Sequence, residues 1–167
     1  MTFEVDPIKF IVHDEPALRG ESNYIARVDL APFGFEDQVE QVWLRRMADD
    51  GEAVVCCIPF RACGLALRDM VRLSAESTVI ELVRPSGSRA LRALIAELDV
   101  EGIRRVNAEV QARISQSGLL FEWSGDRHVA IDVPPGADAE AIMDYFDAEE
   151  AADRLSWEWS DVVRFRI

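Results

Sequence analysis

The order of elements expected in the second half of the chain constrains the fold most. Apolar alternation predicts strands over residues 89–97, 119–123, 127–133 and 155–159. Helical spacing predicts a helix between an N-cap at Asp99 and Gly118, and a second over residues 137–154 with five inward residues: Ala141, Ile142, Tyr145, Phe146 and Ala148. Strand, helix, strand, strand, helix, strand is the split-βαβ pattern of a ferredoxin-like sandwich. We therefore expect a ferredoxin-like βαββαβ half over residues 87–167.

The first half, residues 1–86, has six short predicted strands. They cover residues 6–14, 23–30, 40–48, 52–60, 70–74 and 78–84. The segment Glu36–Ala48 also fits a helix, but Asp50-Gly51 is a hairpin signal that favours a strand paired with the next one. Six short strands indicate a small antiparallel β-barrel-like half or a strongly bent sheet. The fold class we expect is α+β, with Val162–Ile167 as a further strand.

The charge of the chain limits its partners. The 167 residues carry a formal net charge of −13 with a pI near 4.5. Without a basic stripe, binding to nucleic acid or to an anionic membrane surface is not expected. No apolar run is long enough to span a bilayer, and the N-terminus lacks a secretory pattern. With three cysteines, two of them adjacent, we expect a reducing cytoplasm.

The cysteines suggest a thiol site, but most of them fit a core. Cys56 and Cys57 point to opposite faces of a predicted strand, so one zinc ion could not easily use both. We interpret them as small apolar side chains in the core. Cys63 differs, because it follows the strand in a turn close to Arg61, whose charge could lower its pKa and make it nucleophilic.

A weak candidate groove site combines Arg61, Cys63, Asp69 and His13. His13 could serve as the base for Cys63 if the two strand ends met, although an exposed strand-end histidine is the simpler interpretation. Asp69 is expected to cap the turn after Gly64 through backbone N–H groups. His128 is expected on a sheet surface.

No cofactor or metal site is predicted. The acidic residues show no calcium-loop spacing, and neither a phosphate-binding glycine loop nor a nucleophile elbow is present. Trp157 and Trp159 have the same parity in the last strand. We expect them on the helix-free face of their sheet, which would pack on the first half, on a second subunit or on a small ligand.

Several short motifs in the first half occur together in a known family. They are an Ile-x-Phe-x-Val opening strand, residues 40–43, the Cys57-Ile58-Pro59-Phe60 run, Ala66-Leu67-x-Asp69-x-Val71 and Val83-x-Pro85-Ser86-Gly87. Over roughly Lys9 to Ile95 the chain resembles an uncharacterised bacterial family known as a domain of unknown function. The resemblance implies no activity and no catalytic residues.

Three classes of function remain open. The first is a soluble binding or regulatory module that recognises a protein or small ligand between the two halves. The second is a thiol-dependent enzyme using Cys63. The third is an acidic inhibitor or immunity-type protein that docks on a basic partner. The absence of a catalytic constellation favours the first, and a homodimer is one alternative for its assembly.

Overall fold

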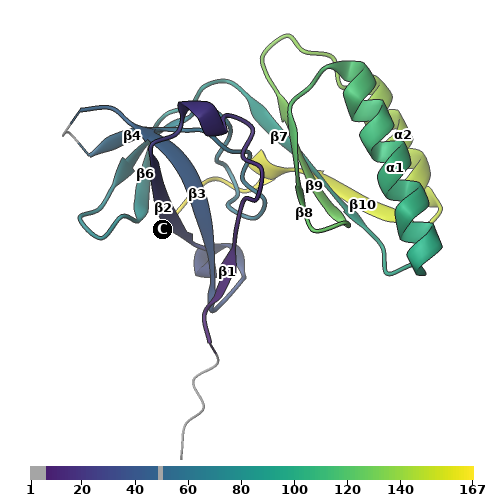
Figure 1. Cartoon of the computed structure of the whole chain (residues 1–167), viewed down its shortest axis with the longest axis horizontal. Coiled ribbons are helices and arrows are strands. Elements are labelled where there is room, and N and C mark those ends of the chain that lie inside the picture. Colours follow the sequence, from purple (N-terminus) through teal and green to yellow (C-terminus); the bar gives the residue numbers. More distant parts are fainter. Residues whose placement is uncertain (1–6, 49–50) are drawn as a thin grey trace, which may run out of the picture.

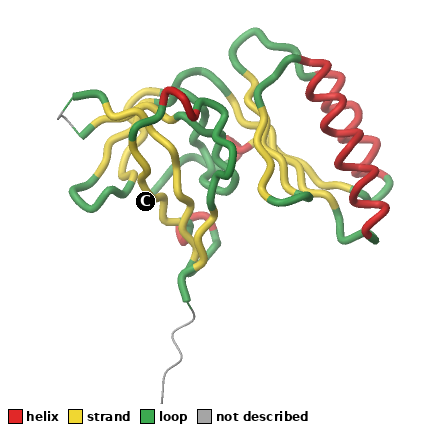
Figure 2. Tube along the Cα trace, viewed as in Figure 1, coloured by secondary structure: helices red, strands yellow, loops and turns green. Residues whose placement is uncertain are grey.

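A computed structural model describes residues 7–48 and 51–167, which form two β-sheets and two α-helices. Figure 1 shows the first sheet and the second sheet as separate lobes, with both helices on the outer side of the second. Figure 2 shows that loops make up much of the first lobe. The chain is therefore an α+β protein, as the sequence predicts.

The first sheet has six strands in the order β1-β3-β4-β5-β6, with β2 also paired to β3. Its strands are β1 (Lys9–Ile11), β2 (Tyr24–Asp29), β3 (Gln38–Arg46), β4 (Glu52–Val55), β5 (Met70–Leu73) and β6 (Val79–Arg84). All neighbours are antiparallel except β1 and β3, which are parallel.

The first sheet curls but does not close into a barrel. Its two far strands, β2 and β6, meet only at the isolated bridge between Arg27 and Thr78, at the start of β6. The predicted antiparallel barrel is therefore wrong, both because the sheet stays open and because it contains a parallel pair. The C-terminal segment runs close to this opening (Figure 1).

Within the segment Glu36–Ala48, residues Gln38–Arg46 form strand β3, which confirms the prediction of a strand over a helix. Glu40, Val42 and Leu44 alternate inward and are fully buried, the two-residue period that a helix would not give. The predicted turn residues Asp49 and Asp50 lie outside the described part of the chain.

Two strands of the first half are shorter than predicted. Strand β4 ends at Val55 rather than near Phe60. The N–H of Cys56 still bonds to the carbonyl of Trp43 on β3 at 2.8 Å, but those of Ile58 and Phe60 bond to the side chains of Glu122 and Glu40. Strand β1 covers only Lys9–Ile11 of the predicted 6–14, of which Asp6 is outside the described residues.

The second sheet has the strand order β10-β7-β9-β8, entirely antiparallel. Its elements run β7 (Arg89–Ile95), α1 (Val100–Ser117), β8 (Phe121–Ser124), β9 (His128–Val133), α2 (Glu140–Ala151) and β10 (Leu155–Trp159). Asp99 caps α1 as predicted, accepting the backbone N–H of Gly102 at 2.7 Å. Gly118 ends the helix with a φ of +73°.

Two side-chain placements that were predicted on α2 and β10 are wrong. Ala141 and Ala148 face solvent on α2, and Glu149 is buried instead, where Arg154 neutralises it at 2.7 Å. Trp157 and Trp159 face the helices, not the helix-free side, because they share the parity of Leu155 and pack on the helix-side core.

The first half covers part of the helix-free face of the second sheet, whereas Leu94 on the same face is 45% exposed. Ala90 and Ala130 on this face belong to the same apolar cluster as the buried side chains of the first sheet. After β10, a short 3-10 helix (Ser160–Val162) begins the C-terminal segment, residues 160–167, and the predicted last strand does not form. No helix in the described residues is long and apolar enough to cross a membrane.

Candidate functional site

The segment that follows β4 is held by a carboxylate from the first sheet. Glu40 of β3 is fully buried. Its Oε1 accepts the backbone N–H of Phe60 at 2.6 Å, and its Oε2 accepts those of Arg61 at 2.9 Å and Ala62 at 2.8 Å. One side chain thus satisfies three consecutive donors that would otherwise be unpaired after the strand ends.

His13 links Glu40 to a carboxylate of the second sheet. Its Nε2 lies 2.9 Å from Oε1 of Glu40, and its Nδ1 lies 2.7 Å from Oε1 of Glu122 on β8. Because both ring nitrogens face carboxylate oxygens, the arrangement suits the imidazolium form. Glu122 also accepts the backbone N–H groups of Ile58 and Ala17, the latter at 3.2 Å.

The electrostatics of this cluster favour its charged form. Burial opposes a charge on His13, but Cys57 and the two carboxylates outweigh it and hold the pKa of His13 well above its usual value. Burial likewise opposes the charge on Glu40, yet His13 and the backbone donors lower the pKa of Glu40. Burial raises the pKa of the Cys57 thiol. The ring of His13 stacks on Phe60 at 4.4 Å.

Sequence reasoning placed His13 differently and missed both of its partners. The expectation of an exposed strand-end histidine is wrong, since the residue is only 3% exposed. Glu40 carried a signal in the sequence, because it shares the parity of the buried Val42 and Leu44. Glu122 carried no such signal in the sequence, because its partners are more than 60 residues away in the chain.

Cys63 and His13 do not form a pair. Cys63 is 9% exposed, and its Sγ lies 3.3 Å from Nη2 of Arg92, a buried residue of β7. Arg61 turns its guanidinium away, to the side chain of Gln38 and over the ring of Phe35. The thiol that neighbours His13 is Cys57. The predicted combination of a nucleophile and a base is therefore not assembled.

Asp69 caps the turn as predicted. Its Oδ2 accepts the backbone N–H of Ala66 at 2.8 Å, and its Oδ1 accepts that of Ser86 at 2.7 Å. Burial raises the pKa of Asp69 in spite of these bonds. The carboxyl group is thus committed to the backbone on both sides, which is a structural role.

Arg92 ties the same segment to the second sheet from the helix-free face. Its Nη1 donates to the carbonyl of Phe60 at 2.8 Å, and its Nη2 pairs with Glu158 on β10. His128 lies on this face with its ring 5.6 Å from that of Phe60. It is partly buried, contrary to the predicted surface position, and burial together with Arg92 and Arg61 lowers its pKa to about 4.

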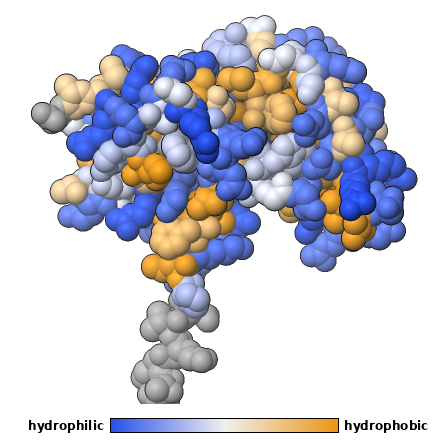
Figure 3. Space-filling model, viewed as in Figure 1, coloured by the Kyte–Doolittle hydropathy of each residue, from blue (hydrophilic) through white to orange (hydrophobic). Residues whose placement is uncertain are grey.

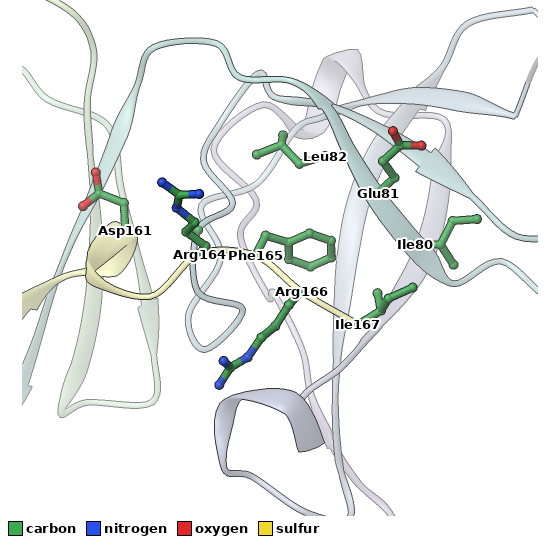
Figure 4. Close-up of a pocket in the computed structure, with 9 residues that line it drawn as sticks. Ile80, Glu81, Leu82, Asp161, Arg164, Phe165, Arg166 and Ile167 are labelled. Atoms are coloured by element: carbon green, nitrogen blue, oxygen red, sulfur yellow. The ribbon is translucent and has the colours of Figure 1, made fainter.

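Open space in the structure lies elsewhere, beside β6. A groove of about 520 Å³ separates this strand from the C-terminal segment. Figure 4 shows the side chains of Ile80 and Leu82 on the β6 side, with Phe165 and Ile167 on the opposite wall. The exposed fractions of Ile80 and Ile167 are 36% and 74%. The groove is thus lined by apolar side chains that remain open to solvent.

The acidic residues of the groove have ion-pair partners in the described part of the chain, but its arginines do not. Asp161 is paired with Arg89 through two bonds of 2.9 and 3.0 Å, and Glu81 is paired with Arg72 at 2.7 Å. Arg164 and Arg166 have no carboxylate partner among the described residues; Arg166 donates instead to the carbonyl of Pro32 at 2.8 and 3.0 Å. The groove of this acidic protein therefore includes two arginines without a carboxylate partner among the described residues.

A glycine in the segment after β4 positions the wall of the groove. Gly64 has a φ of +76°, and its N–H bonds to the carbonyl of Ser160 at 3.1 Å. A Cβ at this residue would lie 2.2 Å from the backbone N of Phe165, so only glycine lets the segments approach so closely. A second hollow of about 240 Å³ adjoins Gly64 and Asp161 and includes Asp69 in its lining.

Two further features bear on the site: the distribution of apolar surface and the placement of side chains that could bind a metal ion. Figure 3 shows hydrophilic residues over most of one face, with apolar residues gathered between the two lobes. Within residues 7–48 and 51–167, no group of three or more His, Cys, Asp or Glu side chains is placed to hold a metal ion. Of the four predicted site residues, Asp69 borders the second hollow. Arg61 and Cys63 lie in the segment after β4 that Glu40 and Arg92 hold, and His13 stacks on Phe60 of that segment.

Comparisons with known proteins give a family and a fold. Residues 40–159 match the model of a family described as Domain of unknown function (DUF4265). The match extends through the second sheet, beyond the stretch in which the sequence motifs lie. No curated protein matches the chain. A crystal structure of a hypothetical protein from Neisseria gonorrhoeae is similar, with a TM-score of 0.62 and 18% identity over 83% of this chain and 96% of that one.

Proposed function

The chain belongs to this family of unknown function, and we propose that it is a binding or regulatory module that recognises a protein or small ligand in the groove beside β6. The groove lies between the first sheet and the segment that follows the second, so its two walls come from the two halves of the chain. The observation that carries the proposal is the exposed apolar lining next to two arginines without carboxylate partners in the described chain.

A thiol-dependent enzyme has less support. Cys63 is nearly buried, bonds to Arg92, and has no histidine or carboxylate among its hydrogen-bond partners in the described residues. An acidic inhibitor that docks on a basic protein is consistent with the net charge of −13. That alternative predicts binding through the acidic surface, with a strong dependence on salt, rather than through the groove.

Two further inferences accompany the proposal. We infer that residues 1–86 and 87–167 are distinct halves and that the second is ferredoxin-like. The order β7-α1-β8-β9-α2-β10 and the sheet order β10-β7-β9-β8 support this topology. We also propose a cytoplasmic location, without nucleic acid or membrane as partner, on the basis of three free buried cysteines and the acidic charge.

Native mass spectrometry of the protein purified from its own host tests the binding proposal. We expect an added mass that is lost on denaturation and that is absent from the variant Ile80→Glu. Ile25→Glu is the matched control, because Ile25 is a similarly exposed isoleucine on β2 that does not line this groove.

Chemical-shift mapping with a library of small fragments and peptides complements the mass spectrum. Binding that perturbs the amides around Ile80 and Phe165 supports the groove. If the added mass survives in Ile80→Glu, or if neither method detects binding at the groove, the proposal is wrong.

A further inference from the structure

We propose that the groove accepts an extended segment of another polypeptide, bearing apolar and acidic side chains, as an added strand on the outer edge of β6. This inference rests on the proposed binding function and specifies its partner class. The evidence is the unpaired edge of β6, the volume of the groove and the charge of its walls.

The edge of β6 is open where the groove lies. Strand β6 is the last in the sheet and pairs with β5 on one side. On its other side, the described residues contribute only the bridge at Thr78, before the strand begins. Ile80, Glu81 and Leu82, which line the groove, follow this bridge. Unpaired N–H and C=O groups on a sheet edge are a template for a further strand.

The opposite wall leaves room for such a strand instead of filling it. The C-terminal segment passes beside β6 without forming a strand, and Val163 has extended dihedrals of −116° and 128°. The C-terminal segment is held by contacts with residues outside β6: Arg166 donates to the carbonyl of Pro32, and the ring of Phe165 lies 6.1 Å from that of Phe33. The first sheet therefore stays open at the place where a closed barrel would have paired its last strand.

The volume fits a short stretch of extended chain. A residue in a sheet advances about 3.3 Å, neighbouring strands are about 4.8 Å apart, and packed layers are about 10 Å apart, which gives about 160 Å³ per residue. A groove of about 520 Å³ is therefore large enough for a short stretch of extended chain.

The charges favour an acidic segment over a basic one. Asp161 is already paired with Arg89, and Glu81 is paired with Arg72, which also contacts Glu52. Arg164 has no hydrogen-bond or carboxylate partner among the described residues. It is one of the residues that line the groove, and Figure 4 shows its guanidinium at the end of the groove nearer to Asp161. A carboxylate of the added strand would form a charge-assisted hydrogen bond there. A second copy of the chain is a poorer occupant, since both copies carry a charge of −13.

Selection from a displayed library of random ten-residue peptides tests the inference with the full chain. We expect enriched peptides that contain Asp or Glu and alternating apolar residues. The best peptide is then synthesised with single backbone N-methyl groups at each position, and its affinity is measured by calorimetry. Methylation at alternate residues should weaken binding at least about tenfold, because each methyl group removes a ladder hydrogen bond.

Two variants test the charge and the location. Arg164→Gln should weaken the peptide at least about fivefold and reduce its salt dependence. The side chain of Arg164 forms no hydrogen bond or ion pair in the described structure, so this substitution should not destabilise the fold. Arg104→Gln on the exposed side of α1 is the control and should leave the affinity unchanged.

The experiments separate failure of the strand-addition inference from failure of the proposed binding function. Binding that Ile80→Glu abolishes but backbone methylation does not affect would overturn strand addition while leaving the groove as a binding site. Enrichment of basic peptides, or no enrichment, would overturn the inference even if native mass spectrometry finds a small ligand in the groove. If the wild-type protein shows neither an added mass nor peptide binding, the proposed function is overturned as well.

Discussion

Replacing Glu40 by glutamine tests whether a buried carboxylate organises the segment after β4. Each carboxylate oxygen accepts two donors: Oε1 faces Phe60 N and His13 Nε2, and Oε2 faces Arg61 N and Ala62 N. The amide of glutamine keeps one acceptor and sets an NH₂ group against two N–H donors, whichever way it turns.

The expected loss follows from these bonds. Two hydrogen bonds to a charged acceptor contribute about 1.5–3 kcal/mol each, and breaking a buried ion pair costs about 3–5 kcal/mol. We expect Glu40→Gln to lower the free energy of unfolding by about 3–5 kcal/mol, a large part of the roughly 5–15 kcal/mol typical of a domain.

Urea unfolding followed by tryptophan fluorescence and circular dichroism measures this loss at pH 6. Glu101→Gln, on the exposed first turn of α1, is the control and should change the stability by less than about 0.5 kcal/mol. A loss below about 1 kcal/mol for Glu40→Gln, with an unchanged urea slope, would show that the buried acceptor is not charged and would refute the reasoning.

Three further predictions follow from the same region. The raised pKa of His13 means that its contribution is complete below its ordinary value of 6.5 and is lost as pH rises through the folded-state value, so the stability difference between the wild type and His13→Gln should shrink from pH 6 to pH 10 in urea titrations. A constant difference would contradict this. Gly64→Ala should cost about 2–4 kcal/mol and speed amide exchange in the C-terminal segment, whereas Gly125→Ala, with positive φ but open space, should cost less. Cys63 should resist iodoacetamide until the chain unfolds, and rapid labelling of the native protein would reopen the thiol-enzyme alternative.

The sequence predicted the second sheet well because its signals are local. Alternation in β7, β9 and β10, the cap at Asp99 and the glycine at 118 depend on neighbours within a few residues. The error for Trp157 and Trp159 has a different cause. Parity placed both on one face correctly, but which face meets the helices depends on the packing of the whole sheet.

The first sheet and the site were harder to predict because they depend on contacts between distant segments. The pair of His13 and Glu122 spans 109 residues, and that of Arg92 and Cys63 spans 29. The end of β4 at Val55 likewise depends on carboxylates from two other strands, whereas the local apolar pattern continues to Phe60. Sequence found Asp69 as a cap, since its partner Ala66 is three residues away.

The buried charges and the open groove are connected through one segment of chain. Glu40 fixes the backbone at Ala62, two residues later Gly64 bonds to Ser160, and the backbone of Phe165 rests against Gly64. A rigid segment after β4 therefore holds the far wall of the groove at a set distance from β6. Holding a site open before its ligand arrives reduces the ordering cost of binding. If the groove binds a partner as we propose, the buried cluster contributes to recognition in this way.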